Sequence, residues 1–108
     1  MRVLLIDDKR SNSDPGCEDA TVIARNYWEG LIMLLNHGPW DKLLIDHDLG
    51  DFDNDGNERT GYDIMCQLEE EVMLYDQTKL PKVIQCVSSN GPGRKRIQQV
   101  IDKLTRGY

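Results

Sequence analysis

The chain has 108 residues, of which 39% are hydrophobic and 30% are charged, and this composition predicts one globular domain spanning residues 1–108. No apolar run approaches the ~20 residues that cross a membrane, and the N-terminus lacks the apolar core of a signal peptide, so we expect a cytoplasmic protein without a membrane partner. The net charge of −6 argues against non-specific binding to duplex DNA, which depends on neutralising phosphates. The basic segment that begins at Arg94 could still hold one phosphate.

The first part of the chain predicts two strands separated by a long loop, followed by a helix. Residues 2–6 are a short apolar run, typical of a strand covered on both faces. Residues 9–19 are polar and contain a Pro-Gly pair, which indicates a loop, and the β-prone run 20–25 predicts a second strand. Asn26 followed by Glu29 matches a helix capping box. The predicted buried stripe of this helix is Trp28, Leu31, Ile32 and Leu35.

The second part alternates strands and helices. Residues 41–45 predict the third strand, and residues 49–59 form a very polar acidic loop. Thr60 is expected to cap the next helix, and residues 82–87 predict the fourth strand. A Gly/Pro-rich turn then leads into a last helix, which Gly107 is expected to close. The predicted buried stripes of these two helices are Ile64, Leu68, Val72 and Tyr75, and Ile97, Val100, Ile101 and Leu104.

Acidic residues follow two of the predicted strands directly. Alternation of strands and helices implies a parallel sheet, and the order 2-1-3-4 places the first and third strands side by side. Asp7, Asp8 and Asp46 then converge at the carboxyl edge, where open α/β sheets bind ligands. Mg²⁺ is the simplest partner for these carboxylates, with Asp48 as a further ligand. The alternative is that they cap turns or pair with the basic side chains of Lys9 and Arg10.

Two further segments suggest phosphate chemistry at this edge. Histidine is the usual proton carrier near neutral pH, so His47 is a candidate catalytic residue that would move a proton, together with Asp46 as a second catalytic candidate. The turn after the fourth strand enters a helix N-terminus, whose N–H groups attract anions. The alternatives are a histidine packed under the acidic loop and an ordinary strand-to-helix connection. The candidate phosphate-binding residues are Ser88, Ser89, Asn90, Gly93 and Arg94.

The acidic loop contains a partial calcium motif. Asp51, Asp53 and Asp55 are spaced as in an EF-hand loop, with a glycine at the sixth position. The twelfth position should be a bidentate glutamate, but it is Tyr62, and a strand rather than a helix precedes the motif. We therefore favour a mobile acidic loop over a Ca²⁺ site.

Four segments of the chain resemble a known family: VLLIDDKR, LLIDHDLG, TGYDI and SSNGPGR. In outline they are similar to the response-regulator receiver fold, a flavodoxin-like three-layer α/β sandwich with an acidic pair after its first strand. More narrowly they resemble the cyclic-phosphate-processing receiver domain, whose members typically show LxLDDxR, LDHDLG and an HSxNPxG-like segment. The resemblance spans nearly the whole chain. It implies a truncated receiver-like fold with about three helices and a role in processing cyclic phosphates.

The chain departs from these patterns in three places. A loop replaces the first receiver helix, and neither a fifth strand nor the receiver lysine follows the last helix. Val87 stands where the family's histidine would fall. The sequence therefore leaves three functions open: a Mg²⁺-assisted phosphoesterase acting on nucleotide or RNA ends, a degenerate receiver that only binds a small phosphorylated ligand or a protein partner, and phospho-signalling through Asp46.

Overall fold

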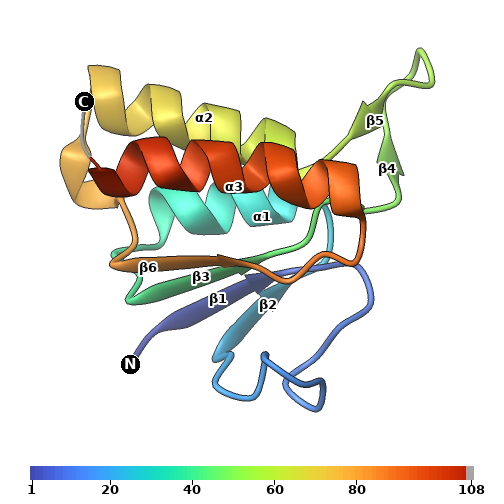
Figure 1. Ribbon diagram of the computed structural model, residues 1–108, viewed down its shortest axis with the longest axis horizontal. Coiled ribbons are helices and arrows are strands. Elements are labelled where there is room, and N and C mark those ends of the chain that lie inside the picture. The colour runs from blue at the N-terminus through green and yellow to red at the C-terminus, as the bar shows by residue number, and fades with distance from the viewer. Residues whose placement is uncertain (107–108) are drawn as a thin grey trace.

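The apolar runs of the sequence form the strands of a parallel sheet, and the amphipathic segments form three α-helices (Figure 1). The computed structural model describes residues 1–106, so the predicted helix end at Gly107 lies outside the described residues. Within that range no helix is both long and apolar enough to traverse a bilayer. In chain order the elements are β1 (Val3–Ile6), β2 (Val22–Ala24), α1 (Tyr27–Asn36), β3 (Lys42–Ile45), β4 (Asp51–Phe52), β5 (Glu58–Arg59), α2 (Gly61–Leu74), the 3₁₀ turn η1 (Gln77–Lys79), β6 (Val83–Cys86) and α3 (Gly91–Arg106).

The main sheet has the strand order β2-β1-β3-β6, which confirms the predicted order 2-1-3-4 once the small hairpin strands are set aside. All three strand pairs are parallel, so the carboxyl ends share one edge. Ile6 of β1 lies opposite Ile45 of β3. The residues that follow, Asp7 and Asp46, therefore leave the sheet side by side. The Asp46 N–H continues the ladder by donating to the Ile6 carbonyl at 3.0 Å.

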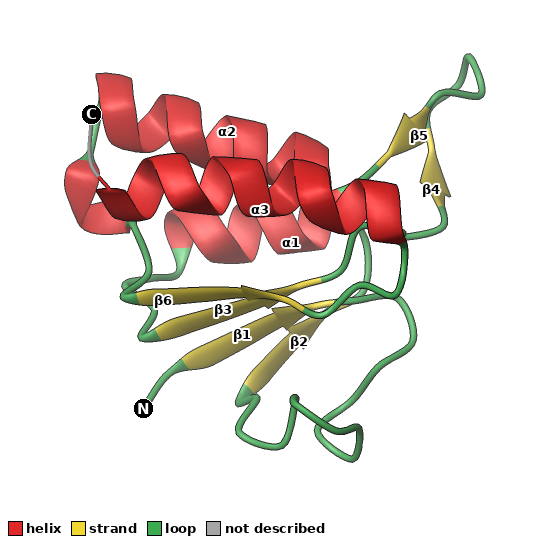
Figure 2. Cartoon of the chain, in the orientation of Figure 1, coloured by secondary structure: helices red, strands yellow, loops and turns green. Residues whose placement is uncertain are grey.

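The sheet is covered differently on its two faces. All three helices pack on one face, where alternate strand residues such as Ile6 and Ile45 join the buried stripes of α2 and α3. The other face is covered by the loop between β1 and β2 (Figure 2). This loop buries Cys17 and Ala20 against Val3. The fold thus has three layers, with a loop as the third layer where a receiver has a helix.

The predicted stripe of α1 is correct for Leu31 and Leu35, which are partly buried against the core, but wrong for Trp28 and Ile32. The buried residues are Tyr27, Gly30 and Leu34, whereas Trp28 is 54% exposed and Ile32 is 48% exposed. Gly30 lies close against the sheet, because a Cβ at that position would lie 2.7 Å from Cγ2 of Ile6. A count of apolar side chains therefore does not identify the buried face of a helix that contacts the sheet through a glycine.

Two other predictions need correction. The acidic segment predicted as a loop contains the antiparallel hairpin β4–β5, which projects beyond the helical layer (Figure 1). Tyr75, predicted to end the buried stripe of α2, is 73% exposed because the helix ends at Leu74. At the other end of α2, Thr60 forms a full capping box with Asp63, which confirms the predicted start of this helix.

Candidate functional site

Three carboxylates meet at the carboxyl edge of β1 and β3. One oxygen from each of Asp7, Asp8 and Asp46 lies within 4.8 Å of the others. Within residues 1–106 this is the one group of three or more acidic, His or Cys side chains close enough to share a metal ion. Asp7 is fully buried and Asp46 is 6% exposed, so their negative charges are poorly screened by water. The predicted convergence of the three side chains is therefore present.

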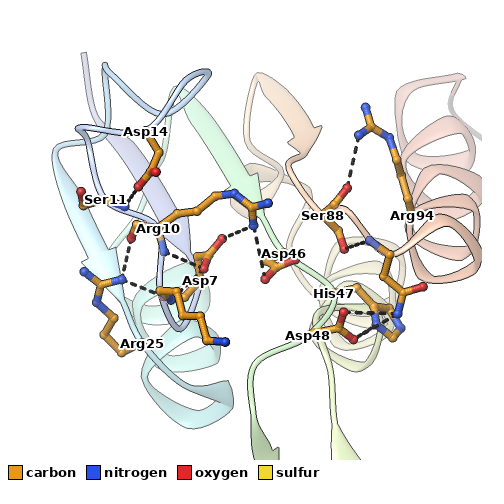
Figure 3. Close-up of polar contacts among 12 residues, drawn as sticks. Asp7, Arg10, Ser11, Asp14, Arg25, Asp46, His47, Asp48, Ser88 and Arg94 are labelled. Carbon is orange, nitrogen blue, oxygen red and sulfur yellow. Dashed lines mark hydrogen bonds and ion pairs between the residues drawn. The ribbon is translucent and has the colours of Figure 1, made fainter.

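The guanidinium of Arg10 contacts two of these carboxylates. Its Nη1 atom lies 2.9 Å from Oδ2 of Asp7 and 3.6 Å from Oδ2 of Asp46 (Figure 3). The other Asp7 oxygen, Oδ1, accepts the backbone N–H groups of Lys9 and Arg10, both at 2.9 Å. These contacts match the alternative in which the carboxylates cap a turn and pair with a basic residue. The hydrogen bond to Asp7 raises the pKa of Arg10, so it stays charged.

The environment of Asp46 disfavours its charged form. Burial raises the pKa of this carboxyl above its usual range, and the nearby charge of Asp7 raises it further. Hydrogen bonding from the Ser88 side chain and the charge of Arg10 act in the opposite direction but are smaller. A divalent cation at this position would offset the repulsion between the two carboxylates.

The backbone at Asp46 is held by the start of α2. The N–H of Gly61 donates to the carbonyl of His47 at 2.8 Å. A Cβ on Gly61 would lie only 1.9 Å from the carbonyl oxygen of Asp46, so no larger residue fits without moving the chain. Gly61 thus allows the helix to approach the carboxyl end of β3 closely and fixes where the Asp46 carboxylate emerges.

His47 faces the helical side rather than the acidic cluster. Its ring is buried against Gly93 at the start of α3, and its Nδ1 lies 2.9 Å from Oδ1 of Asp48. Its Nε2 is buried without a hydrogen-bond partner. His47 therefore contacts the edge of the site through Asp48, whose pKa is lowered chiefly by this hydrogen bond. The nearby Asn90 amide adds two contacts to the same carboxylate, at 3.1 and 3.2 Å.

The candidate phosphate-binding residues are mostly engaged with one another. Ser88 is buried, and its hydroxyl accepts the backbone N–H of Asn90 at 3.1 Å. The Asn90 side chain accepts the N–H of Gly93 at 3.0 Å and so caps α3 itself. Arg94 extends away from Asp46, with its Nη1 donating to the Ser88 carbonyl at 3.3 Å (Figure 3). Of the five residues, only Ser89 lines the acidic cavity.

An open cavity of about 360 Å³ lies over the three carboxylates. Its volume falls within the range of small-ligand sites. Asp48, predicted as a metal ligand, lines the cavity but is not part of the three-carboxylate group. The sequence prediction gave Arg10 no functional role, although its basic side chain three residues after Asp7 was a usable signal. The lining residues are Asp7, Asp8, Lys9, Arg10, Asp46, Asp48 and Ser89.

The calcium-like motif has a different function in the structure. Asp51 accepts the N–H of Tyr27 at the start of α1 at 3.1 Å and pairs with Arg59 at 3.2 Å. Asp53 accepts two backbone N–H groups, from Asp55 and Asn57, and closes the hairpin turn. These carboxylates hold the β4–β5 hairpin and attach it to α1.

Comparison with known proteins supports one relationship. The family model for the cyclic-phosphate processing receiver domain matches residues 2–103, which is nearly the whole chain. Searches of curated proteins and of solved structures give no match. The family match agrees with the strand order and with the paired aspartates after β1. The chain therefore belongs to the cyclic-phosphate processing receiver domain family.

Proposed function

We propose that this domain binds Mg²⁺ at Asp7, Asp8 and Asp46 and uses it to hold the phosphate group of a small phosphorylated ligand or of a nucleotide or RNA end. The observation that carries the proposal is the approach of three carboxylate oxygens to within 4.8 Å, on side chains that include two buried ones. Mg²⁺ is usually held by one or two carboxylates together with waters and phosphate oxygens. The open cavity beside the cluster leaves space for such a phosphate.

A cyclic phosphate is the ligand that the family suggests, and its hydrolysis is the reaction we propose. Water would attack phosphorus, and the bond from phosphorus to one ribose oxygen would break to give a monoester. The proton lost by the water would pass to Asp48, which lines the cavity and bonds to His47, and then to the leaving oxygen. The bound cation would supply electrostatic stabilisation of the charge that grows on the phosphoryl oxygens.

A second candidate function is a module that binds phosphate without chemistry. Val87, which stands in place of the family's histidine, packs with the buried residues on the loop-covered face of the sheet. The other histidine near the site, His47, has Nδ1 engaged by Asp48 and Nε2 buried. These two observations reduce the number of side chains that can transfer a proton in the cavity, and they favour the binding module.

Calorimetric titration with Mg²⁺ tests the metal site. We expect Asp46→Asn and Asp7→Asn to weaken binding by roughly tenfold or more, about 1.4 kcal/mol each. Asp55→Asn removes the same charge from the exposed tip of the β4–β5 hairpin and should leave the affinity unchanged. Equal affinities for all four proteins would reject the assignment.

Phosphorus NMR with Mg²⁺ and a panel of 2′,3′-cyclic nucleotides separates the two functions. Formation of a monoester by the wild type, and its loss in Asp46→Asn, is the result expected for the phosphoesterase. Binding of the nucleotide without product would instead identify the non-catalytic module. Phospho-signalling through Asp46 is tested separately, because beryllofluoride should perturb the amide spectrum of a phosphoacceptor domain.

A further inference from the structure

We infer that Arg10 is a built-in counter-cation of the acidic cluster, which leaves its carboxylate partners when a divalent ion binds and then contacts the phosphate of the ligand. This inference rests on the proposed function, because it requires that the cluster binds a divalent ion. It assigns to Arg10 a role in ligand binding and in setting the metal affinity.

The contacts of Arg10 place its charge on the proposed metal ligands. Its Nη1 contacts the Oδ2 atoms of Asp7 and Asp46, at 2.9 and 3.6 Å. Both of these aspartates are buried, and a carboxylate oxygen of one lies within 4.8 Å of a carboxylate oxygen of the other. Without a positive charge between them, the two carboxylates would repel each other strongly. Without a metal, the guanidinium therefore supplies the positive charge that the folded chain needs at this edge.

A divalent ion and the Arg10 guanidinium would repel each other if both contacted the carboxylates of Asp7 and Asp46. Mg²⁺ binds carboxylate oxygens at about 2.0–2.1 Å, so an ion held by Asp7 and Asp46 would lie close to the Arg10 cation, which contacts the same two carboxylates. Two adjacent cations in a partly buried site repel each other. Binding of the metal should therefore displace the side chain of Arg10 rather than add to its contacts.

The structure allows the side chain to move while the main chain stays in place. The N–H of Arg10 is held by Oδ1 of Asp7, and its carbonyl accepts a hydrogen bond from Arg25. The Arg10 side chain is 30% exposed and lines the open cavity of about 360 Å³. A displaced guanidinium would thus remain in the cavity where we place the phosphate.

The charges around the cavity are consistent with this exchange. Its lining contains four carboxylates and the two cations of Lys9 and Arg10, a formal net charge of −2 that one divalent ion would neutralise. A phosphate that enters afterwards would meet a cavity without excess negative charge. The planar guanidinium fork is suited to two parallel hydrogen bonds with phosphate oxygens, which an ammonium group cannot form in the same way.

Arg10→Gln tests the exchange because it should change two affinities in opposite directions. With Mg²⁺ alone, measured by calorimetry, we expect binding roughly tenfold tighter than in the wild type, since no internal cation competes. With saturating Mg²⁺ and inorganic phosphate as the probe, we expect phosphate binding roughly tenfold weaker. Lys9→Gln is the matched control, because it removes one positive charge from the same cavity lining without removing a contact to Asp7 or Asp46. It should change the Mg²⁺ affinity much less than Arg10→Gln does.

Each pattern of results has a distinct meaning. Tighter Mg²⁺ binding together with weaker phosphate binding in Arg10→Gln supports the exchange. If the wild type binds Mg²⁺ through Asp46 but Arg10→Gln has the same metal affinity or a lower one, the Arg10 inference is overturned and the metal site stands. If neither protein binds Mg²⁺, the proposed function fails, and the exchange fails with it.

A measurement on the wild type covers the case in which Arg10→Gln does not fold. The Arg10 side-chain Nε–Hε signal in a nitrogen–proton NMR spectrum should shift on Mg²⁺ addition and shift again on phosphate addition. The corresponding signal of Arg59, whose guanidinium pairs with Asp51 on the β4–β5 hairpin, is the internal control. An Arg10 signal that is unchanged at saturating Mg²⁺ would overturn the exchange.

Discussion

Gly61→Ala is expected to damage both the stability and the metal site, because this glycine sets the distance between α2 and the end of β3. A Cβ at position 61 would lie 1.9 Å from the Asp46 carbonyl oxygen, 2.9 Å from its carbonyl carbon and 3.1 Å from Cγ1 of Ile45. The nearest contacts are backbone atoms, which cannot rotate away as a flexible side chain would. Either the start of the helix or the end of the strand must therefore move.

The expected size of the effect follows from two opposing contributions. Replacing a helical glycine with alanine reduces the entropy of the unfolded chain and stabilises the fold by about 0.4–1 kcal/mol where the new residue fits. Overpacking a filled interior costs about 1–3 kcal/mol, and more when the backbone has to shift. With contact this close, we expect a net loss of about 2 kcal/mol or more, which lowers Tm by roughly 10 °C in a domain of this size.

Gly91→Ala is the matched control for this experiment. Gly91 is also the first residue of an α-helix, and a Cβ there would meet no atom within 4 Å. This variant should be as stable as the wild type or slightly more stable. Urea unfolding followed by the fluorescence of the buried Trp40 measures both variants, and Mg²⁺ calorimetry follows the site. The steric argument is refuted if Gly61→Ala is as stable as Gly91→Ala. If Gly61→Ala is destabilised but keeps the wild-type Mg²⁺ affinity, Gly61 does not position Asp46.

Two further changes test the electrostatics and the packing of the site. Burial and the charge of Asp7 raise the pKa of Asp46, so this carboxyl binds a proton more tightly in the folded protein than in the unfolded chain. Asp46 therefore makes the wild type lose stability as the pH rises from the usual carboxyl range through the raised pKa. In the presence of a chelator, Asp46→Asn should therefore be more stable than the wild type at neutral pH, and this difference in stability should vanish in acid. If urea unfolding gives the same difference in stability across this pH range, Asp46 does not have a raised pKa. Gly93→Ala would place a Cβ 2.4–2.7 Å from atoms of the His47 ring, so we expect a loss of about 1–3 kcal/mol and a shifted His47 ring signal in the NMR spectrum. An unchanged ring signal would show that the imidazole does not pack there.

The parts of the fold that could be predicted are those with strong local signals. Short apolar runs identified β1 and β3, because strands buried on both faces need continuous apolar sequence. Burial alternates along the edge strand β6 instead, and only Ile84 and Cys86 of this strand are buried. Parallel pairing then required Asp7 and Asp46 to emerge at one edge, and the structure confirms this. The buried face of α1 could not be obtained in the same way, because Gly30, which lies close to Ile6 of the sheet, has no apolar side chain to count.

The sequence predicted which carboxylates meet at the site, but it did not predict the hydrogen bonds among the polar side chains around them. His47 lies on the helical side, away from the acidic cluster, as the alternation of side chains along a strand favours, but alternation does not show that the ring packs under Gly93. The turn after β6 had the composition of an anion-binding turn. Its polar groups instead cap α3 and contact Asp48, a choice that depends on the position of α3 relative to β3. Such long-range hydrogen bonds leave no periodic signal in the sequence.

The loop that replaces the first receiver helix accounts for the position of Arg10. The Asp7 carboxylate accepts two backbone N–H groups from the residues after Asp8, and this closes a tight turn directly at the end of β1. The turn directs the Arg10 side chain back over Asp7, to which its guanidinium donates, and toward Asp46 on the neighbouring strand end. Farther along the loop, Cys17 and Ala20 cover the second face of the sheet with small side chains. This loop thus completes the core and also supplies the cation of the acidic cluster. Because both roles depend on the path of the loop, shortening it between Arg10 and Cys17 should alter the metal affinity even though no proposed metal ligand is removed.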